Sequence, residues 1–139
     1  MNTLMNELVT KAKEARQSAY VPYSKFPVGA ALLSESDEII LGCNIENASY
    51  GLSNCAERTA FFKAISNAKQ QSDKKFKALA VVADTERPTP PCGACRQVIA
   101  EFCDGKMPVY LANLKGDIFE TTVEGLLPGA FLPGDLPEK

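Results

Sequence analysis

Residues 76–83, FKALAVVA, constrain the fold of this chain more than any other segment. The run is dominated by Ala, Leu and Val and shows little alternation between apolar and polar residues. A strand of this kind is typical of a sheet position where both faces are covered. We therefore expect a central strand with a layer of helices on each side.

The segments around this run supply those layers. Apolar spacing and turn residues predict helices over 3–20, 55–68 and 93–103, a short helix capped by Thr122 that runs through Leu127, and strands over 27–33, 38–43, 76–83, 109–112 and 117–121. Helix and strand alternate in the middle of the chain. This order predicts an α/β protein, a three-layer α/β/α sandwich around a mixed five-stranded sheet. With no internal repeat and no long linker, residues 1–139 are expected to form a single domain.

Composition and charge exclude several classes of protein. The net charge is −2 and the pI is near 5.2, which argues against a nucleic-acid-binding surface. No run approaches the roughly 20 apolar residues of a membrane span. The N-terminus lacks the residue order of a signal peptide, and the five cysteines are an odd number. We therefore expect reduced thiols and a cytoplasmic protein that binds neither nucleic acid nor membrane.

Three cysteines carry the chemistry. Cys55 lies in the run NCAER, and Cys92 and Cys95 lie in PCGAC. The chain contains no histidine, so a transition-metal site must be built mostly from thiolates. Each motif opens a predicted helix, where the partial positive charge favours the thiolate form. Three thiolates leave a tetrahedral zinc one open position, which separates a catalytic zinc from a structural one.

Two neighbours of Cys55 suit such a site. Glu57 points well round the helix from the sulfur of Cys55, so its carboxylate can reach the open position and move protons without binding the metal. Three thiolates give the site an excess negative charge. The Arg58 guanidinium can offset it by donating hydrogen bonds to the sulfurs.

Other interpretations of these residues stay open at the level of sequence. The Cys-x-x-Cys pair can be a redox centre, and a closed structural zinc can recruit Cys43 or Cys103 as a fourth ligand. These two cysteines can equally be small buried hydrophobes. Glu57 can be a surface residue favoured by the helix dipole, and Arg58 an exposed arginine without a specific contact.

The sequence resembles the cytidine deaminases, specifically their short single-domain form that acts on nucleosides. The matching segments span nearly the whole chain and are 22–31, 42–48, 55–60, 91–97 and 127–131. The two thiol motifs are shared with the wider deaminase superfamily, in which three cysteine ligands beside a non-ligating glutamate form an established pattern. The block NIEN at 44–47 is the more specific signal.

The resemblance implies a cytidine deaminase-like fold and a role for each matched residue. Cys55, Cys92 and Cys95 bind one Zn²⁺ per subunit, and Glu57 shuttles protons. The implied substrate-binding residues are Phe26, Asn44, Glu46, Tyr50, the backbone of Ala56, and Phe131 contributed by a neighbouring subunit. Asn44 and Glu46 match the ribose-binding pair, and the short members of the family are homotetramers.

The implied reaction is hydrolytic deamination of free cytidine and deoxycytidine to uridine and deoxyuridine with release of ammonia, in pyrimidine salvage. One alternative is a related zinc deaminase of another cytosine-containing or polynucleotide substrate. An alternative of another class is a non-catalytic interaction module stabilised by structural zinc. The aromatic residues Phe26 and Phe131 can also be core residues without a binding role.

Overall fold

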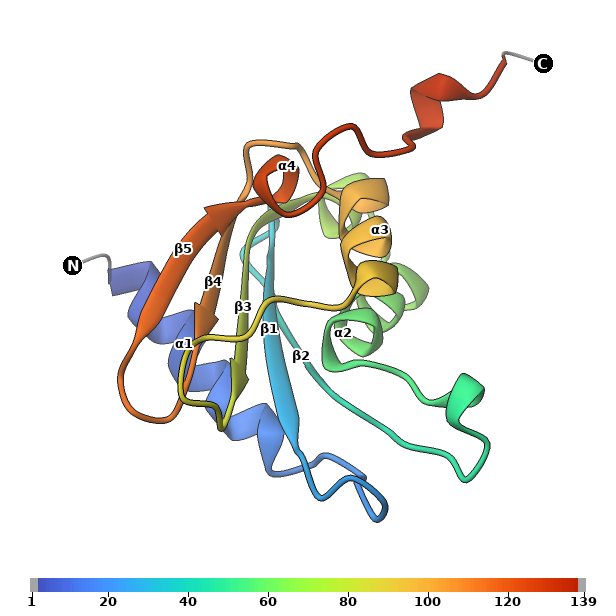
Figure 1. The fold of residues 1–139 in the computed structure, drawn as a ribbon. Helices are drawn as coiled ribbons and strands as arrows, with labels where there is room; N and C mark the ends of the chain where they lie inside the picture. The colour runs from blue at the N-terminus through green and yellow to red at the C-terminus, as the bar shows by residue number, and fades with distance from the viewer. Residues whose placement is uncertain (1–2, 138–139) are drawn as a thin grey trace.

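The computed structural model describes residues 3–137, which form a five-stranded sheet covered by helices on both faces (Figure 1). The helices are α1 (Thr3–Arg16), α2 (Ala56–Ser66), α3 (Gly93–Phe102) and α4 (Val123–Leu126), with short 3-10 helices at Tyr50–Leu52, Gln71–Lys74 and Pro133–Asp135. The strands are β1 (Val28–Ser34), β2 (Ile39–Cys43), β3 (Phe76–Ala83), β4 (Pro108–Ala112) and β5 (Ile118–Thr122).

The sheet is mixed, as the sequence predicts. Its strand order is β2-β1-β3-β4-β5, so β3 is the central strand. The β3–β4 pair is parallel, whereas β1–β2, β1–β3 and β4–β5 are antiparallel. Every residue of β3 except Lys77 is buried, which confirms that both faces of this strand are covered.

Two hydrophobic cores lie on opposite faces of the sheet. On one face α1 packs against Ala78, Ala80 and Val82 of β3. On the other face α2 and α3 pack against Leu79 and Val81 of the same strand. Alternate residues of β3 thus serve two separate cores, and the three-layer α/β/α arrangement is confirmed (Figure 1).

The first helix is shorter than its sequence predicts. The expected helix over 3–20 is wrong beyond Arg16, where α1 ends. Tyr20 pairs instead with the segment after β2, since its N–H donates to the Asn44 carbonyl and its own carbonyl accepts from the Glu46 N–H. This non-local pairing requires extended backbone at Tyr20, although the helical apolar spacing continues to Ala19.

The first turn of α2 lies unusually close to β2. A Cβ atom added to Gly42 would collide with the Ala56 carbonyl oxygen and would lie 2.6 Å from the Ala60 nitrogen. Real Cβ contacts essentially never occur at such distances, and the atoms concerned are backbone. Glycine at position 42 therefore allows the start of α2 to rest directly on the sheet.

We predict that Gly42→Ala lowers the free energy of unfolding by about 1–3 kcal/mol, because the added methyl group forces α2 away from β2. The matched control is Gly134→Ala, where an added Cβ meets no atom within 4 Å. This control should change stability by less than about 1 kcal/mol. Urea unfolding measures both variants, and equal stability of the two would contradict the close approach.

Candidate metal centre and substrate pocket

The three predicted cysteines meet where α2 and α3 begin. Cys55 is the N-cap residue of α2, Cys92 is the N-cap residue of α3, and Cys95 lies in the first turn of α3. Neither N-cap thiol makes a capping hydrogen bond to the backbone of its own helix. The Cys55 and Cys92 sulfurs are 3.7 Å apart, and those of Cys92 and Cys95 are 3.3 Å apart.

This donor set fits zinc. A tetrahedral zinc with Zn–S bonds of about 2.3 Å holds its sulfurs about 3.8 Å apart, close to the separations observed. All three sulfurs lie within 4.8 Å of one another, and among the described residues no other His, Cys, Asp or Glu side chain joins this group. Three protein donors are the number that a catalytic zinc takes.

Arg58 contacts the cluster as expected. Its Nη2 donates a hydrogen bond of 3.3 Å to the Cys55 sulfur. Hydrogen bonds from the Cys95 thiol and from Arg58 lower the pKa of Cys55 to about 5. The hydrogen bond with Cys55 and burial raise the pKa of Cys95. The alternative of an exposed arginine without a specific contact is therefore wrong.

Glu57 is buried, although a glutamate in the first turn of a helix usually faces water. Only 4% of its surface is exposed. Burial raises the pKa of Glu57 to about 7. A carboxyl group with such a pKa can both accept and release a proton near neutral pH. This burial excludes the interpretation of Glu57 as a surface residue.

A pocket of about 260 Å³ opens beside the cysteines. Its lining consists of strand ends, the start of α2 and the segment before α3, namely Phe26, Val28, Asn44, Cys55, Ala56, Glu57, Val81, Ala83, Thr89, Pro90, Pro91 and Cys92. Four residues predicted from the sequence as catalytic or substrate-binding, Phe26, Asn44, Ala56 and Glu57, thus share one cavity with two of the three cysteines, Cys55 and Cys92.

Asn44 and Glu46 hold the segment that carries Phe26. The Asn44 side chain accepts from the Val28 N–H and donates to the Phe26 carbonyl, both at 2.9 Å. Glu46 accepts from the backbone N–H groups of Tyr23 and Ser24, both at 3.1 Å. Hydrogen bonding from Ser24 lowers the pKa of Glu46, which keeps it ionised. Glu46 does not line the pocket, whereas Asn44, two residues before it, does.

Two of the predicted aromatic residues lie outside the pocket of this chain. Tyr50 is 72% exposed and makes an edge contact with Tyr23 at a centroid distance of 6.4 Å. Phe131 is 60% exposed, and its carbonyl accepts a hydrogen bond of 2.7 Å from Gln97. The alternative that Phe26 and Phe131 are core residues is wrong, because Phe26 is also exposed to 39%.

Sequence reasoning missed the wall formed by Thr89, Pro90 and Pro91. Residues 84–91 follow the central strand, and in open α/β sheets ligands bind beyond the carboxyl ends of strands. The location of this segment directly after the central strand is the sequence signal for a pocket wall. Its three prolines make it look like an ordinary loop.

The remaining cysteines lie outside the metal cluster. Cys103 packs against the core formed by α2, α3 and the sheet, and burial raises its pKa to about 12. Cys43 is half-buried, and burial raises its pKa as well. Neither thiol is placed as a fourth ligand, which removes the basis for a closed four-cysteine site.

We predict that Cys103 resists alkylation by iodoacetamide at pH 8 in the native protein and reacts fully in urea, because the raised pKa of its partly buried thiol keeps it protonated while the protein is folded. Mass spectrometry of the peptide that carries Cys103 measures the modification. Rapid modification under native conditions would show that this thiol is not a core residue.

Comparisons with known proteins agree with this geometry. The family model for the cytidine and deoxycytidylate deaminase zinc-binding region matches residues 3–111. The cytidine deaminase of Sporosarcina psychrophila is 67% identical over 132 residues, which cover 95% of this chain and 94% of that protein. The cytidine deaminase of Halalkalibacterium halodurans is 60% identical over 129 residues, with 93% and 95% coverage.

The structural comparison gives the same result. The crystal structure of cytidine deaminase from Burkholderia pseudomallei superposes with a TM-score of 0.85 at 48% identity, covering 94% of this chain and all of that one. Sequence and structure thus match over nearly the full length of this chain and of each protein compared with it. The chain therefore belongs to the cytidine and deoxycytidylate deaminase family, whose zinc-binding region it contains.

Proposed function

We propose that this protein is a zinc-dependent hydrolase that deaminates free cytidine and deoxycytidine to uridine and deoxyuridine and releases ammonia. The observation that carries the proposal is the burial of Glu57 in one pocket with Cys55 and Cys92. The cytidine deaminases of similar sequence support the same activity. The whole chain, residues 1–139, is proposed to form one catalytic domain.

Cys55, Cys92 and Cys95 are the proposed ligands of one zinc ion per subunit. Zinc bound there supplies a nucleophile, because it lowers the pKa of a coordinated water to about 7. Arg58 offsets the negative charge of the thiolates through its hydrogen bond to Cys55. The arrangement of three cysteines from two helix starts supports this assignment.

Glu57 moves the protons of the reaction. Its carboxylate accepts a proton from the attacking water and delivers it to ring N3 of the base, which makes C4 electrophilic. The water oxygen adds to C4, and Glu57 then takes the remaining proton of that oxygen and passes it to the exocyclic amine as the C4–N4 bond breaks. The products are uridine or deoxyuridine and ammonia. A pKa near 7 suits this double role at neutral pH.

The substrate is proposed to lie between Phe26 and the start of α2, where the backbone of Ala56 contacts the base. Asn44 and ionised Glu46 are proposed to bind the sugar. An amide and a carboxylate together can donate hydrogen bonds to hydroxyl groups and accept hydrogen bonds from them. Tyr50 lies near the sugar in this proposal. An analogue without the recognised hydroxyl group would leave these polar groups unpaired and should bind poorly.

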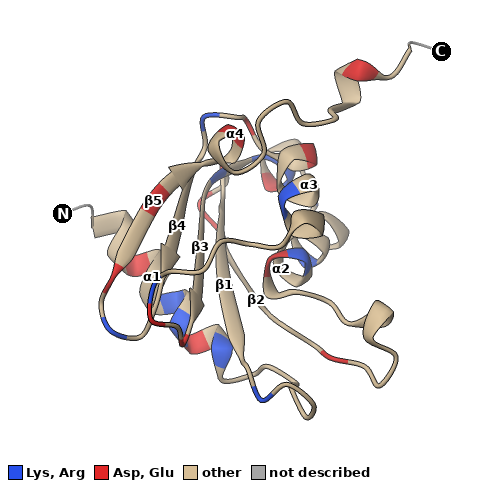
Figure 2. Ribbon diagram, in the orientation of Figure 1, with Lys and Arg blue, Asp and Glu red and all other residues tan. Residues whose placement is uncertain are grey.

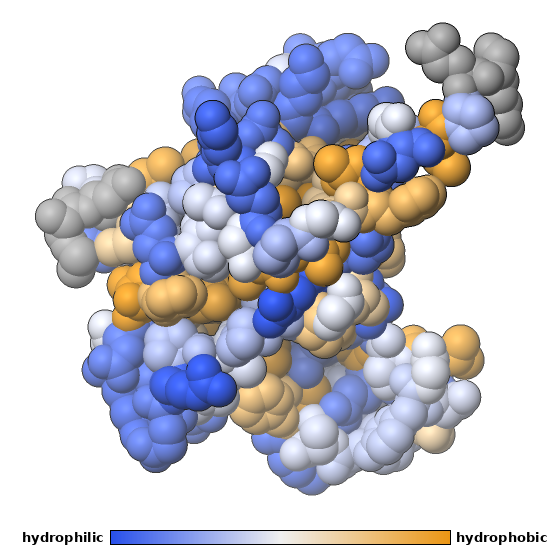
Figure 3. All heavy atoms as spheres, turned by 45° about the horizontal axis from the view of Figure 1, so that its top comes forward, coloured by the Kyte–Doolittle hydropathy of each residue, from blue (hydrophilic) through white to orange (hydrophobic). Residues whose placement is uncertain are grey.

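Phe131 is proposed to reach the pocket of a neighbouring subunit in a homotetramer. The chain beyond α4 leaves the body of the molecule (Figure 1), and Phe131, Leu132 and Leu136 are exposed on it. Figure 3 shows hydrophobic residues along this tail, up to the grey C-terminal atoms. Exposed apolar side chains of this kind are suited to a contact between subunits.

We propose a cytoplasmic role in pyrimidine salvage, without binding to nucleic acid. All five cysteines are free thiols, in keeping with a reducing compartment. Basic and acidic residues are interspersed over the ribbon in Figure 2, and the net charge is −2, so the electrostatic basis for polynucleotide binding is weak. Within residues 3–137, no helix is both long and apolar enough to cross a membrane.

The activity is tested by following the ultraviolet absorbance of cytidine after addition of the protein. We expect the absorbance to fall, a zinc chelator to stop the reaction, and added zinc to restore it. A single-stranded oligonucleotide that contains cytosine should remain unmodified. Deamination of the oligonucleotide but not of cytidine would instead support a polynucleotide deaminase, and inactivity on both would support a non-catalytic zinc module.

The role of Glu57 is tested with Glu57→Gln, which keeps the shape of the side chain but cannot accept a proton. We expect this variant to bind zinc as the unchanged protein does and to lose at least about 100-fold in kcat. Zinc content is measured by atomic absorption and turnover by the cytidine assay. Near-normal turnover in a zinc-loaded variant would refute the proton shuttle.

A further inference from the structure

Residues 84–92, between β3 and α3, form one wall of the pocket. Thr89, Pro90, Pro91 and Cys92 of this segment line the cavity. Prolines at positions 88, 90 and 91 restrict the backbone and donate no hydrogen bonds. The wall is therefore stiff, and its position depends on the contacts that hold its two ends.

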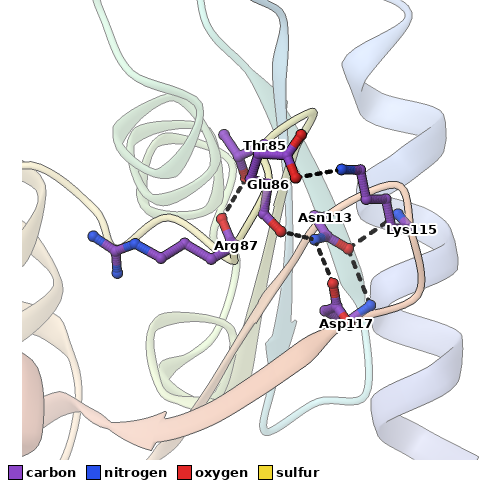
Figure 4. A network of polar contacts seen from close by, with 6 residues as sticks. All are labelled: Thr85, Glu86, Arg87, Asn113, Lys115 and Asp117. Atoms are coloured by element: carbon purple, nitrogen blue, oxygen red, sulfur yellow. Dashed lines mark hydrogen bonds and ion pairs between the residues drawn. The ribbon is translucent and has the colours of Figure 1, made fainter.

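Each end is held by one buried or half-buried polar side chain. Near α3, Arg96 donates through Nε to the Pro91 carbonyl at 2.8 Å and through Nη1 to the Leu126 carbonyl at 2.7 Å. Near β3, Asn113 donates through Nδ2 to the Glu86 carbonyl at 3.1 Å. Figure 4 shows Asn113 between the Glu86 carbonyl and Asp117.

Both polar atoms of the Asn113 side chain, Oδ1 and Nδ2, form hydrogen bonds in this network. It is 1% exposed, and its Oδ1 accepts from the N–H groups of Lys115 and Asp117, each at 3.0 Å. Its Nδ2 also donates to Asp117 Oδ2 at 2.8 Å. The same side chain thus closes the β4–β5 turn and reaches across to the pocket wall. A buried polar network in which every member is satisfied is rigid.

The parallel pairing of β3 and β4 makes this contact possible. Val82 of β3 lies beside Ala112 of β4, so the chain leaves both strands at the same edge of the sheet. Glu86 and Asn113 follow these positions by four residues and one residue. The contact between them therefore joins the two segments that leave this edge.

The ion pair between Lys115 and Glu86 joins the same two segments at 2.7 Å but contributes less. The Lys115 side chain is 51% exposed and that of Glu86 is 93% exposed. Exposed ion pairs of this kind stabilise proteins little because water and salt screen them. The buried amide of Asn113 is thus the stronger link.

We propose that Asn113 is a positioning residue for substrate binding, which holds the 84–92 wall of the pocket through the Glu86 carbonyl. It touches no substrate and acts only through the wall that it anchors. The hydrogen bond from Asn113 to the Glu86 carbonyl is called the tether. The identity of the substrate rests on the proposed function, whereas the tether does not. Loss of the tether loosens the wall and weakens binding of the nucleoside.

The test exchanges two side chains of the turn in the double variant Asn113→Asp with Asp117→Asn. Composition and net charge are unchanged. The new carboxylate at position 113 still accepts from the turn N–H groups, and the new amide at position 117 donates back to it. The Glu86 carbonyl, in contrast, loses its donor and faces an oxygen. The matched control is Lys115→Met, which removes the ion pair and keeps the tether.

In the double variant we expect faster amide hydrogen exchange in the 84–92 peptide without substrate, and a modestly lower thermal midpoint, because the Glu86 carbonyl is left beside a carboxylate without its donor. The KM for cytidine should rise about three- to tenfold, with a smaller fall in kcat, because a displaced wall weakens binding. The control should match the unchanged protein in exchange and in KM.

Unchanged exchange in the double variant would overturn the proposal, and so would faster exchange with an unchanged KM. If the double variant does not fold, Asn113→Ser supplies the same readouts, because a serine hydroxyl can close the turn but is too short to reach Glu86. Hydrogen exchange needs no substrate. An unchanged protein that fails to deaminate cytidine would therefore count against the proposed function and not against the tether.

Discussion

The structure depends on how closely the first turn of α2 can approach the sheet. Gly42 lies beneath Ala56 and Ala60, and its missing side chain leaves the space in which the helix backbone sits. Cys55 immediately precedes this turn and Glu57 lies within it. A larger residue at position 42 would lift the proposed metal ligand Cys55 and the buried carboxyl group of Glu57 together, so one packing contact positions both parts of the proposed chemistry.

The same closeness explains the electrostatics of the site. Ala56 and Ala60 are fully buried against the sheet, and Glu57 is drawn out of water beside them. Its charged form loses hydration, which raises its pKa to about 7. Arg58, one residue further, points at the Cys55 sulfur and favours the thiolate. Burial thus raises the pKa of the Glu57 carboxyl group, whereas hydrogen bonds from Cys95 and Arg58 lower the pKa of the Cys55 thiol.

Much of this architecture follows from periodicity and spacing. The unbroken apolar run of β3 predicts a central strand, and the cysteine spacings predict a cluster at two helix starts, as found. The end of α1 could not be predicted, because the pairing of Tyr20 with Ile45 is a contact between distant segments. The burial of Glu57 and the pocket wall at Thr89 likewise depend on packing between elements, which local patterns do not encode.

X-ray absorption spectroscopy of the zinc-loaded protein tests the central claim most directly, because it counts the atoms bound to the metal. The account predicts three sulfur neighbours at about 2.3 Å and one lighter atom, oxygen or nitrogen, in the fourth position. Four sulfur neighbours would mean that another cysteine closes the site, and fewer than three would mean that the cluster of Cys55, Cys92 and Cys95 does not hold the metal.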